Sequence, residues 1–182
     1  MERREAIKWV ASLVGGTLIG AEAFLSGCAR NSESTFFSSD EMNLLDEIGE
    51  TILPETSKSP GAKAAKIADF VQKIVRDCYS TEEQEIFKSG FLKVEEKSDQ
   101  VFGNSFTMLS AGQKMTVLEF FEAESKETKE NASPHFFTMT KQLTIWGYFT
   151  SEVGVTQALR YDPIPGKSEG CLDLKPGQPA WY

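Results

Sequence analysis

Histidine and cysteine, two side chains much used for metal ligation and nucleophilic catalysis, are scarce in this chain of 182 residues. There is one histidine, His135, and there are three cysteines. A catalytic dyad or a histidine-based metal site usually needs more than one such group. We therefore expect His135, which follows a proline at a helix start, to be exposed or weakly structural. We predict no catalytic, metal-binding or cofactor-binding residue in this chain.

Motifs of nucleotide-binding and metal-dependent enzymes are also missing. The sequence has no His-Glu-x-x-His pair, no Cys-x-x-Cys pair and no phosphate-binding glycine loop. Acidic runs such as residues 81–85 are most simply solvated helix faces. This pattern favours an accessory or binding protein over an enzyme. A small enzyme with perturbed carboxylates near His135 is a third alternative.

The chain has no excess of basic residues, because its formal net charge is −8. Phosphate backbones repel an acidic protein, so we expect no nucleic acid partner. An anionic membrane surface offers no attraction either. Hydrophobic residues make up 40% of the chain and charged residues 25%, which is ordinary for a globular domain with one core. Membrane contact would therefore need a separate anchor.

The N-terminus has the order of a bacterial lipoprotein signal. A charged start precedes an apolar run from Trp9 to Leu25, which contains several glycines and is a poor permanent membrane span. Leu25-Ser-Gly-Cys28 resembles a lipobox, so we predict cleavage after residue 27 and a lipid on Cys28. An amphipathic or core helix is the alternative for this segment.

The charged start itself indicates the export route. Arg3 and Arg4, followed by Ile7-Lys8, resemble the twin-arginine signal for export of folded proteins, although Ala6 departs from that pattern. The general secretory route is the alternative. We expect a membrane-anchored lipoprotein on the periplasmic face of a bacterial membrane. The predicted divisions are a signal peptide at 1–27, a lipidated tether at 28–38, a helical domain at 39–160 and a docking extension at 161–182.

Two cysteines remain if Cys28 is acylated. Cys78 and Cys171 form an even pair in an extracytoplasmic compartment, where one disulfide is possible. Two free thiols, with Cys78 packed in a helix, are an equal alternative. A bridge from Cys171 to another chain is a third.

Apolar periodicity and capping signals predict an all-α fold, a compact bundle of about five helices with an irregular Pro/Gly-rich C-terminal extension. No alternation typical of strands is present. The first helix ends before Pro54, and residues 122–133 are expected to be a loop or a frayed end. The expected helix starts are Ser38 with Glu41, a position near Ser59, Ser80 with Glu83, Ser110 with Gln113, and Pro134 in a first turn.

Aromatic residues near the C-terminus are the candidate partner interface. Gly147 and Gly154 permit close approach of another element, and aromatic residues with polar tips are common at interfaces. The alternative for Trp146 and Phe149 is the core of the domain itself. The extension at 161–182 holds four of the seven prolines, so it is neither a helix nor a central strand. The predicted interface residues are Trp146, Tyr148, Phe149, Tyr161 and Trp181.

Short motifs in both halves of the mature chain carry a family resemblance. They are Thr51–Thr56, Pro60–Ala62, Trp146–Gly154, Gln157–Tyr161, Pro163-x-Pro-Gly166, Gly170-Cys171 and Lys175–Gln178. Together they resemble the gluconate 2-dehydrogenase subunit 3 family over roughly residues 40–182. A twin-arginine signal fits that family, and a lipobox is a variation on it.

The resemblance implies a small, non-catalytic subunit of an exported oxidoreductase complex. The partner it implies is a large FAD-dependent flavoprotein of the glucose–methanol–choline type that oxidises a sugar, sugar acid or alcohol. A multihaem cytochrome c subunit is a further expected partner. The small subunit would assist export, maturation and stability of the large one, and the lipid on Cys28 would tether both. The alternative is a free-standing envelope lipoprotein that binds a carbohydrate or another envelope component.

Overall fold

The computed structural model describes residues 36–127, 133–164 and 175–181, together with residues 5, 166, 170, 171 and 173. It divides into two units, residues 1–36 and 37–182, and only the second is described below. Arg3, Arg4 and Cys28 lie outside the described residues, so the predicted signal and lipid site have no structural counterpart here. Within the described part, no helix has the length and apolar character needed to cross a membrane.

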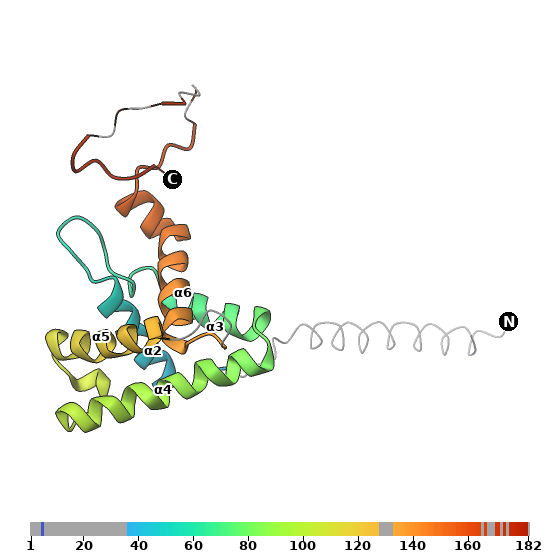
Figure 1. Cartoon of the computed structure of the whole chain (residues 1–182). Coiled ribbons are helices and arrows are strands. Elements are labelled where there is room, and N and C mark those ends of the chain that lie inside the picture. The colour runs from blue at the N-terminus through green and yellow to red at the C-terminus, as the bar shows by residue number, and fades with distance from the viewer. Residues whose placement is uncertain are drawn as a thin grey trace. The chain divides into compact units, whose positions relative to one another are not determined.

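The described residues of the second unit form five α-helices, which confirms the all-α prediction (Figure 1). The described residues contain no β-strand, and their single β-bridge joins Arg160 to Trp181. The elements are α2 (Ser39–Ile52), α3 (Ile67–Cys78), α4 (Thr81–Phe102), η1 (Phe106–Met108, a 3-10 helix), α5 (Ala111–Glu127), α6 (Phe136–Thr150) and η2 (Gly154–Ala158, a π-helix).

Three predicted helix starts are confirmed by their caps. Ser38 and Ser80 are the N-caps of α2 and α4, and each exchanges hydrogen bonds with the glutamate three residues later. Before α5, the Gln113 side chain accepts from both the amide and the hydroxyl of Ser110, at 3.0 and 2.9 Å. Because these contacts satisfy backbone donors within one turn, local sequence alone specifies them.

Helix α3 begins at Ile67, not near Ser59 as expected. Residues 53–66 form a loop instead, and long-range contacts hold it. The Glu50 carboxylate of α2 accepts from the amides of Glu55 and Lys63, at 2.8 and 2.9 Å. These bonds stabilise a loop in place of an earlier helix start. The local sequence around Ser59 gives no sign of them, because the acceptor lies on α2.

Two other expected boundaries are also wrong. Helix α5 continues to Glu127, so residues 122–127 of the stretch expected to be a loop or a frayed end are helical, and Glu122 pairs with Lys141 of α6 at 3.0 Å. Residues 128–132 of that stretch lie outside the described residues. Helix α6 starts one residue after His135, so Pro134 precedes the N-cap and does not occupy the first turn. A tertiary contact accompanies the longer α5, whereas the start of α6 is set by the local cap at His135.

Helix α6 is the central element of the unit, since it contacts each of the other four α-helices. Figure 1 shows its C-terminal half continuing beyond α4 and α5 towards the C-terminal segment. Gly90 lets α4 approach it closely, because a Cβ there would lie 2.3 Å from the Phe136 ring. The buried side chains of α6 include Phe136, Phe137, Met139, Leu143 and Tyr148.

Phe37 belongs to the core, although sequence reasoning placed it in the tether. Its side chain is fully buried, and its ring lies 5.8 Å from Phe87 and 5.2 Å from Phe91. Its amide donates to Gln72 Oε1 at 3.0 Å. Aromatic pairs of this kind add to the stabilisation from area burial alone. The packed domain therefore begins at Phe37.

His135 caps α6 in its neutral form. Its Nδ1 accepts from the Phe137 amide at 3.2 Å, and Nε2 lies 3.7 Å from a Glu124 carboxylate oxygen. Burial lowers the pKa of His135 below its ordinary value, and Lys93 also lowers it, while Glu124 opposes both. The imidazole thus resists protonation in the folded protein.

We expect the folded domain to lose stability as the pH falls below the ordinary histidine pKa of 6.5. The unfolded chain then binds a proton that the folded chain resists, and the loss levels off below the lowered folded pKa. Melting temperatures from about pH 7.5 to about pH 5.5 test this. His135→Asn is the control, because asparagine caps helices without titrating. Parallel pH profiles for the two proteins would contradict the assignment, as this is the chain's single histidine.

Candidate partner-docking surface

Helix α6 buries most of its apolar residues, but three more lie on its opposite side, which also carries Lys141 and Gln142. A typical surface helix has charged and polar residues on that side. In the second unit, however, Ile145 is exposed, Trp146 is 54% exposed and Phe149 is half-buried. The described residues of the second unit therefore leave one side of its central helix uncovered. We call Ile145, Trp146 and Phe149 the α6 surface.

Trp146 is held in place by α3. Its ring meets Phe70 edge to face, with centroids 5.4 Å apart. Gly147 permits this approach, because a Cβ at that position would lie 2.5 Å from Phe70 Cδ1. A large aromatic side chain fixed on a rigid helix loses little conformational entropy when a partner covers it. Trp146 thus has the properties of an interface anchor.

Tyr148 is a core residue, which corrects the prediction that it faces a partner. Its side chain is 3% exposed, and its hydroxyl donates to the Pro60 carbonyl at 2.5 Å. The polar tip that suggested an interface is therefore satisfied within the chain. This bond fastens the loop at 53–66 to α6, so the motifs at Pro60–Ala62 and Trp146–Gly154 meet in space.

Charged groups hold the same loop to the bundle. Glu47 of α2 pairs with Lys63 of the loop and, at 2.6 Å, with Lys114 of α5. Burial disfavours the charged form of Glu47, but the two ammonium groups outweigh it and hold the pKa of this carboxyl below its ordinary value. The loop is thus anchored directly on α2 and α6, and Glu47 links it to α5.

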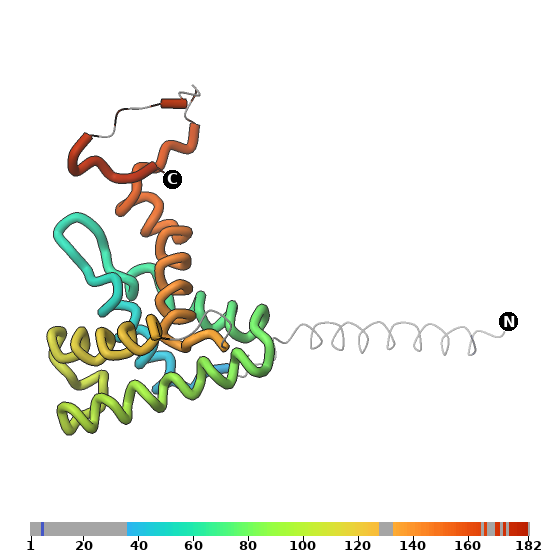
Figure 2. Tube along the Cα trace, in the orientation of Figure 1, coloured from blue at the N-terminus to red at the C-terminus, as the bar shows by residue number. Residues whose placement is uncertain are grey.

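The C-terminal segment returns to the end of η2. The Arg160 amide donates to the Ala180 carbonyl at 2.8 Å, and the guanidinium lies 3.8 Å from the centre of the Trp181 ring. Tyr161 and Trp181, both predicted interface residues, are exposed. Figure 2 shows the red C-terminal trace coming back to the orange trace at this point.

The two remaining thiols are not joined. Cys78, at the last position of α3, and Cys171 are both free and exposed in the structure. Of the alternatives weighed for this pair, the structure has free thiols, with Cys78 at the surface and not packed as a small hydrophobe.

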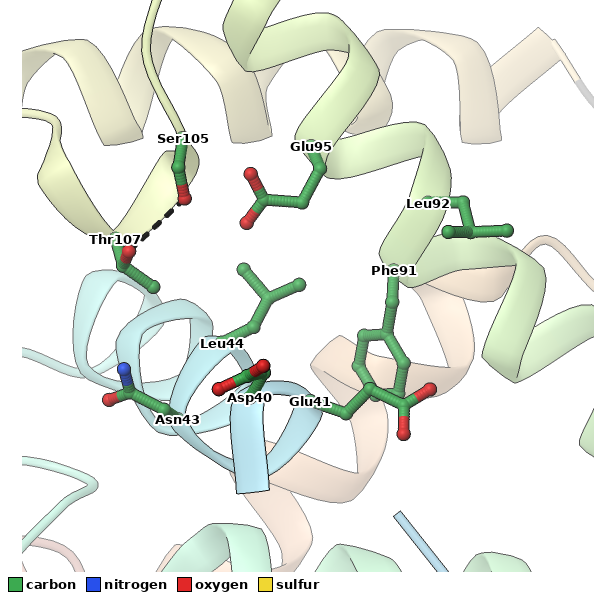
Figure 3. A pocket seen from close by; sticks show the side chains of 9 residues that line it. All are labelled: Asp40, Glu41, Asn43, Leu44, Phe91, Leu92, Glu95, Ser105 and Thr107. Atoms are coloured by element: carbon green, nitrogen blue, oxygen red, sulfur yellow. Dashed lines mark hydrogen bonds between the residues drawn. The ribbon is translucent and has the colours of Figure 1, made fainter. Parts of the chain in front are cut away.

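A hollow of about 390 Å³ lies between α2, α4 and η1 (Figure 3). Its acidic groups already serve the fold. Glu41 accepts from the Ser38 amide at 2.7 Å, and Glu95 accepts from the Phe106 amide at 3.1 Å. Asp40 lies in the first turn of α2, where a carboxylate is favourable. The hollow carries no catalytic assignment. Among the residues the structure describes, no cluster of three or more His, Cys, Asp or Glu is arranged to hold a metal ion.

Residues 166–170 fit the pattern Gly-x-Ser-x-Gly, which sequence reasoning missed. A nucleophile elbow of that pattern joins a strand to a helix. The described residues on either side of this stretch belong to neither kind of element. The match therefore carries no catalytic role.

Sequence reasoning also missed Phe70, Ile145 and Arg160, which position or extend the exposed aromatic groups. The signal for Ile145 was present, since helical spacing places it on the same side of α6 as Trp146 and Phe149. Phe70 and Arg160 gave no such signal, because their partners lie at distant positions in the sequence. Contacts of this kind become visible only when the elements are packed.

Comparison with curated proteins and with solved structures found no match. A family model described as gluconate 2-dehydrogenase subunit 3 matches residues 39–166. The match spans α2 to η2, including the loop at 53–66 and the α6 surface, and it ends before Cys171 and Trp181. It covers well over half of the chain and confirms the resemblance for the motifs up to Gly166, while Gly170-Cys171 and Lys175–Gln178 lie beyond the matched residues. The chain therefore belongs to the gluconate 2-dehydrogenase subunit 3 family.

Proposed function

We propose that this protein is the non-catalytic small subunit of an exported FAD-dependent dehydrogenase of the glucose–methanol–choline type. Family membership supports the coarser part of this proposal, since it implies the small subunit of a gluconate 2-dehydrogenase complex. The large subunit would carry the FAD and oxidise a sugar, sugar acid or alcohol. A multihaem cytochrome c would accept the electrons. The small subunit would contribute export, maturation, stability and membrane attachment.

The observation that carries the proposal is the uncovered side of α6. The central helix leaves Trp146 more than half exposed, although that ring is fixed against Phe70, and Ile145 is exposed beside it. Fixed aromatic anchors of this kind are typical of protein interfaces, where they contribute much of the binding energy. A large partner subunit would cover them.

Attachment to the membrane is the second part of the proposal. Arg3 and Arg4 supply a twin-arginine-type signal, and Cys28 supplies a lipid site. Export in a folded state suits a partner that binds its cofactor before crossing the membrane. The lipid would then hold the complex on the periplasmic face, where a cytochrome subunit could reach it.

The experiment that tests the proposal is purification of the tagged full-length protein from its native membranes in mild detergent. We expect a large chain to copurify, to be identified by mass spectrometry as a flavoprotein and to show the visible absorbance of oxidised flavin. The preparation should reduce an artificial electron acceptor with a sugar, sugar acid or alcohol. A colourless protein that purifies alone would contradict the proposal.

Replacing Trp146 with serine is expected to weaken retention of the large subunit by at least about tenfold, because a central tryptophan anchor is commonly worth 2 kcal/mol or more. Flavin absorbance per small subunit measures the retention. The matched control is Met108→Ser, which removes a 79% exposed apolar side chain from η1. Equal losses in the two variants would argue against a specific α6 surface.

A free-standing envelope lipoprotein is the second candidate function. Trp146, Tyr161 and Trp181 are exposed aromatic groups that could stack on sugar rings. This candidate predicts a lone monomer from membranes whose tryptophan fluorescence changes on addition of envelope carbohydrates.

A further inference from the structure

The C-terminal segment is closed into a loop at one narrow place. Arg160 and Trp181 form a parallel β-bridge, with the amide hydrogen bond from Arg160 to Ala180 at 2.8 Å. The Arg160 guanidinium also covers the Trp181 ring at 3.8 Å. We call this pair of residues the neck. One hydrogen bond and one cation–π contact thus join two points 21 residues apart in the sequence.

The described residues beyond the neck contribute almost nothing to the core. Every described residue from Tyr161 to Trp181 is exposed except Gln178, which is half-buried. Ile164 is 83% exposed. These described residues therefore do not pack on their own bundle, yet they include aromatic and apolar side chains that a solvated tail would lack.

We propose that the neck closes a docking loop for the large dehydrogenase subunit and preforms its described parts, residues 161–164 and 175–181. This rests on the proposed function and adds the element that makes the contact. Closing the loop in advance removes an entropy cost from binding, since the ends are already together. Four prolines within the loop restrict its backbone further. Arg160 is a positioning residue, and Ile164 and the free face of Trp181 are contact residues.

The charge of the loop favours a protein as its occupant. Residues 160–181 contain three basic groups, Arg160, Lys167 and Lys175, and three acidic groups, Asp162, Glu169 and Asp173, so their net charge is zero. The remaining residues carry all of the chain's −8. Because the loop is neutral, it has no excess of basic residues that would attract it to an anionic lipid surface. A partner protein that carries negative charge would meet the least electrostatic repulsion at this neutral part of the chain.

The large subunit is a better candidate for the occupant of the docking loop than a second copy of the chain. The α6 surface and the loop follow one another in the sequence and meet through η2, so one large partner can cover both. A second copy would bring another chain of net charge −8 against the first, at a cost that grows as the salt concentration falls.

The test uses the complex from native membranes with full-length small-subunit variants. Arg160→Ala and Trp181→Ala each remove one side of the cation–π contact. We expect each to lower the amount of identified flavoprotein retained by about tenfold after a fixed detergent wash. The double variant should lose no more than Trp181→Ala alone, because Trp181→Ala already breaks the neck and also removes a contact residue.

Controls separate this role from general stability. The isolated variants should melt at the wild-type temperature, since the neck lies outside the core. Arg76→Ala, which removes the guanidinium beside Asp77 on α3, should leave retention unchanged. Normal retention in both neck variants, beside a wild type that holds the flavoprotein, would overturn the docking loop but not the proposed function. A wild type without flavoprotein would overturn both. A wild-type homodimer that Arg160→Ala separates would overturn the choice of occupant.

Discussion

Replacing both Arg3 and Arg4 with lysine is expected to leave this protein and its large subunit in the cytoplasm. The twin-arginine translocase recognises the paired guanidinium groups, which form a planar fork that lysine lacks. Under the proposed function the large subunit has no signal of its own and crosses only with the small one. Cell fractionation followed by immunoblotting for both chains measures the effect.

Arg30→Lys is the matched control for this experiment. It makes the same chemical change two residues after the predicted lipid site, outside the signal segment. We expect normal export of both chains in that variant. Export of the large subunit by cells that retain the lysine-substituted small subunit would contradict the escort role. Export of both chains would show that the general secretory route is used.

Replacing Gly154 with alanine is expected to lower the melting temperature by roughly 3–10 °C, because overpacking of this kind commonly costs about 1–3 kcal/mol. A Cβ at Gly154 would lie 1.9 Å from the Tyr148 carbonyl oxygen. That oxygen is fixed, since it accepts from the amide and the hydroxyl of Ser151, at 3.1 and 2.7 Å. The end of α6 and the start of η2 must then separate.

The same change should also weaken the complex, because η2 connects the α6 surface to the neck at Arg160. Thermal melting of the isolated protein and flavoprotein retention measure the two effects. The control is Gly112→Ala in α5, where a Cβ meets nothing within 4 Å. Alanine there should be neutral or stabilising by up to about 1 kcal/mol. A Gly154→Ala protein as stable as the control would show that the junction adapts.

Helix caps were predictable because their contacts are local. Ser38 and Ser80 each bond to a residue three positions later, and the structure forms both capping boxes. The number of helices followed from apolar periodicity for the same reason. Boundaries set by distant partners were not predictable. Glu50 delays the start of α3, and Lys141 pairs with Glu122 in a stretch that sequence reasoning assigned to a loop.

The candidate interface was predictable only in part. Aromatic residues with polar tips were expected at a surface, and Trp146 and Trp181 are exposed. Tyr148 has the same chemistry, but the Pro60 carbonyl accepts its hydroxyl proton inside the domain. Composition does not distinguish these residues, because the distinction depends on which acceptor lies within reach after folding.

By itself the sequence determined the all-α class, the caps, the family motifs and the N-terminal signal pattern, since each depends on residues close together in the chain. Only the tertiary structure decided that Phe37 belongs to the core, that α6 keeps one side uncovered and that Arg160 meets Trp181. Those features depend on which distant surfaces pack together, and the spacing of residues along the chain does not specify that packing.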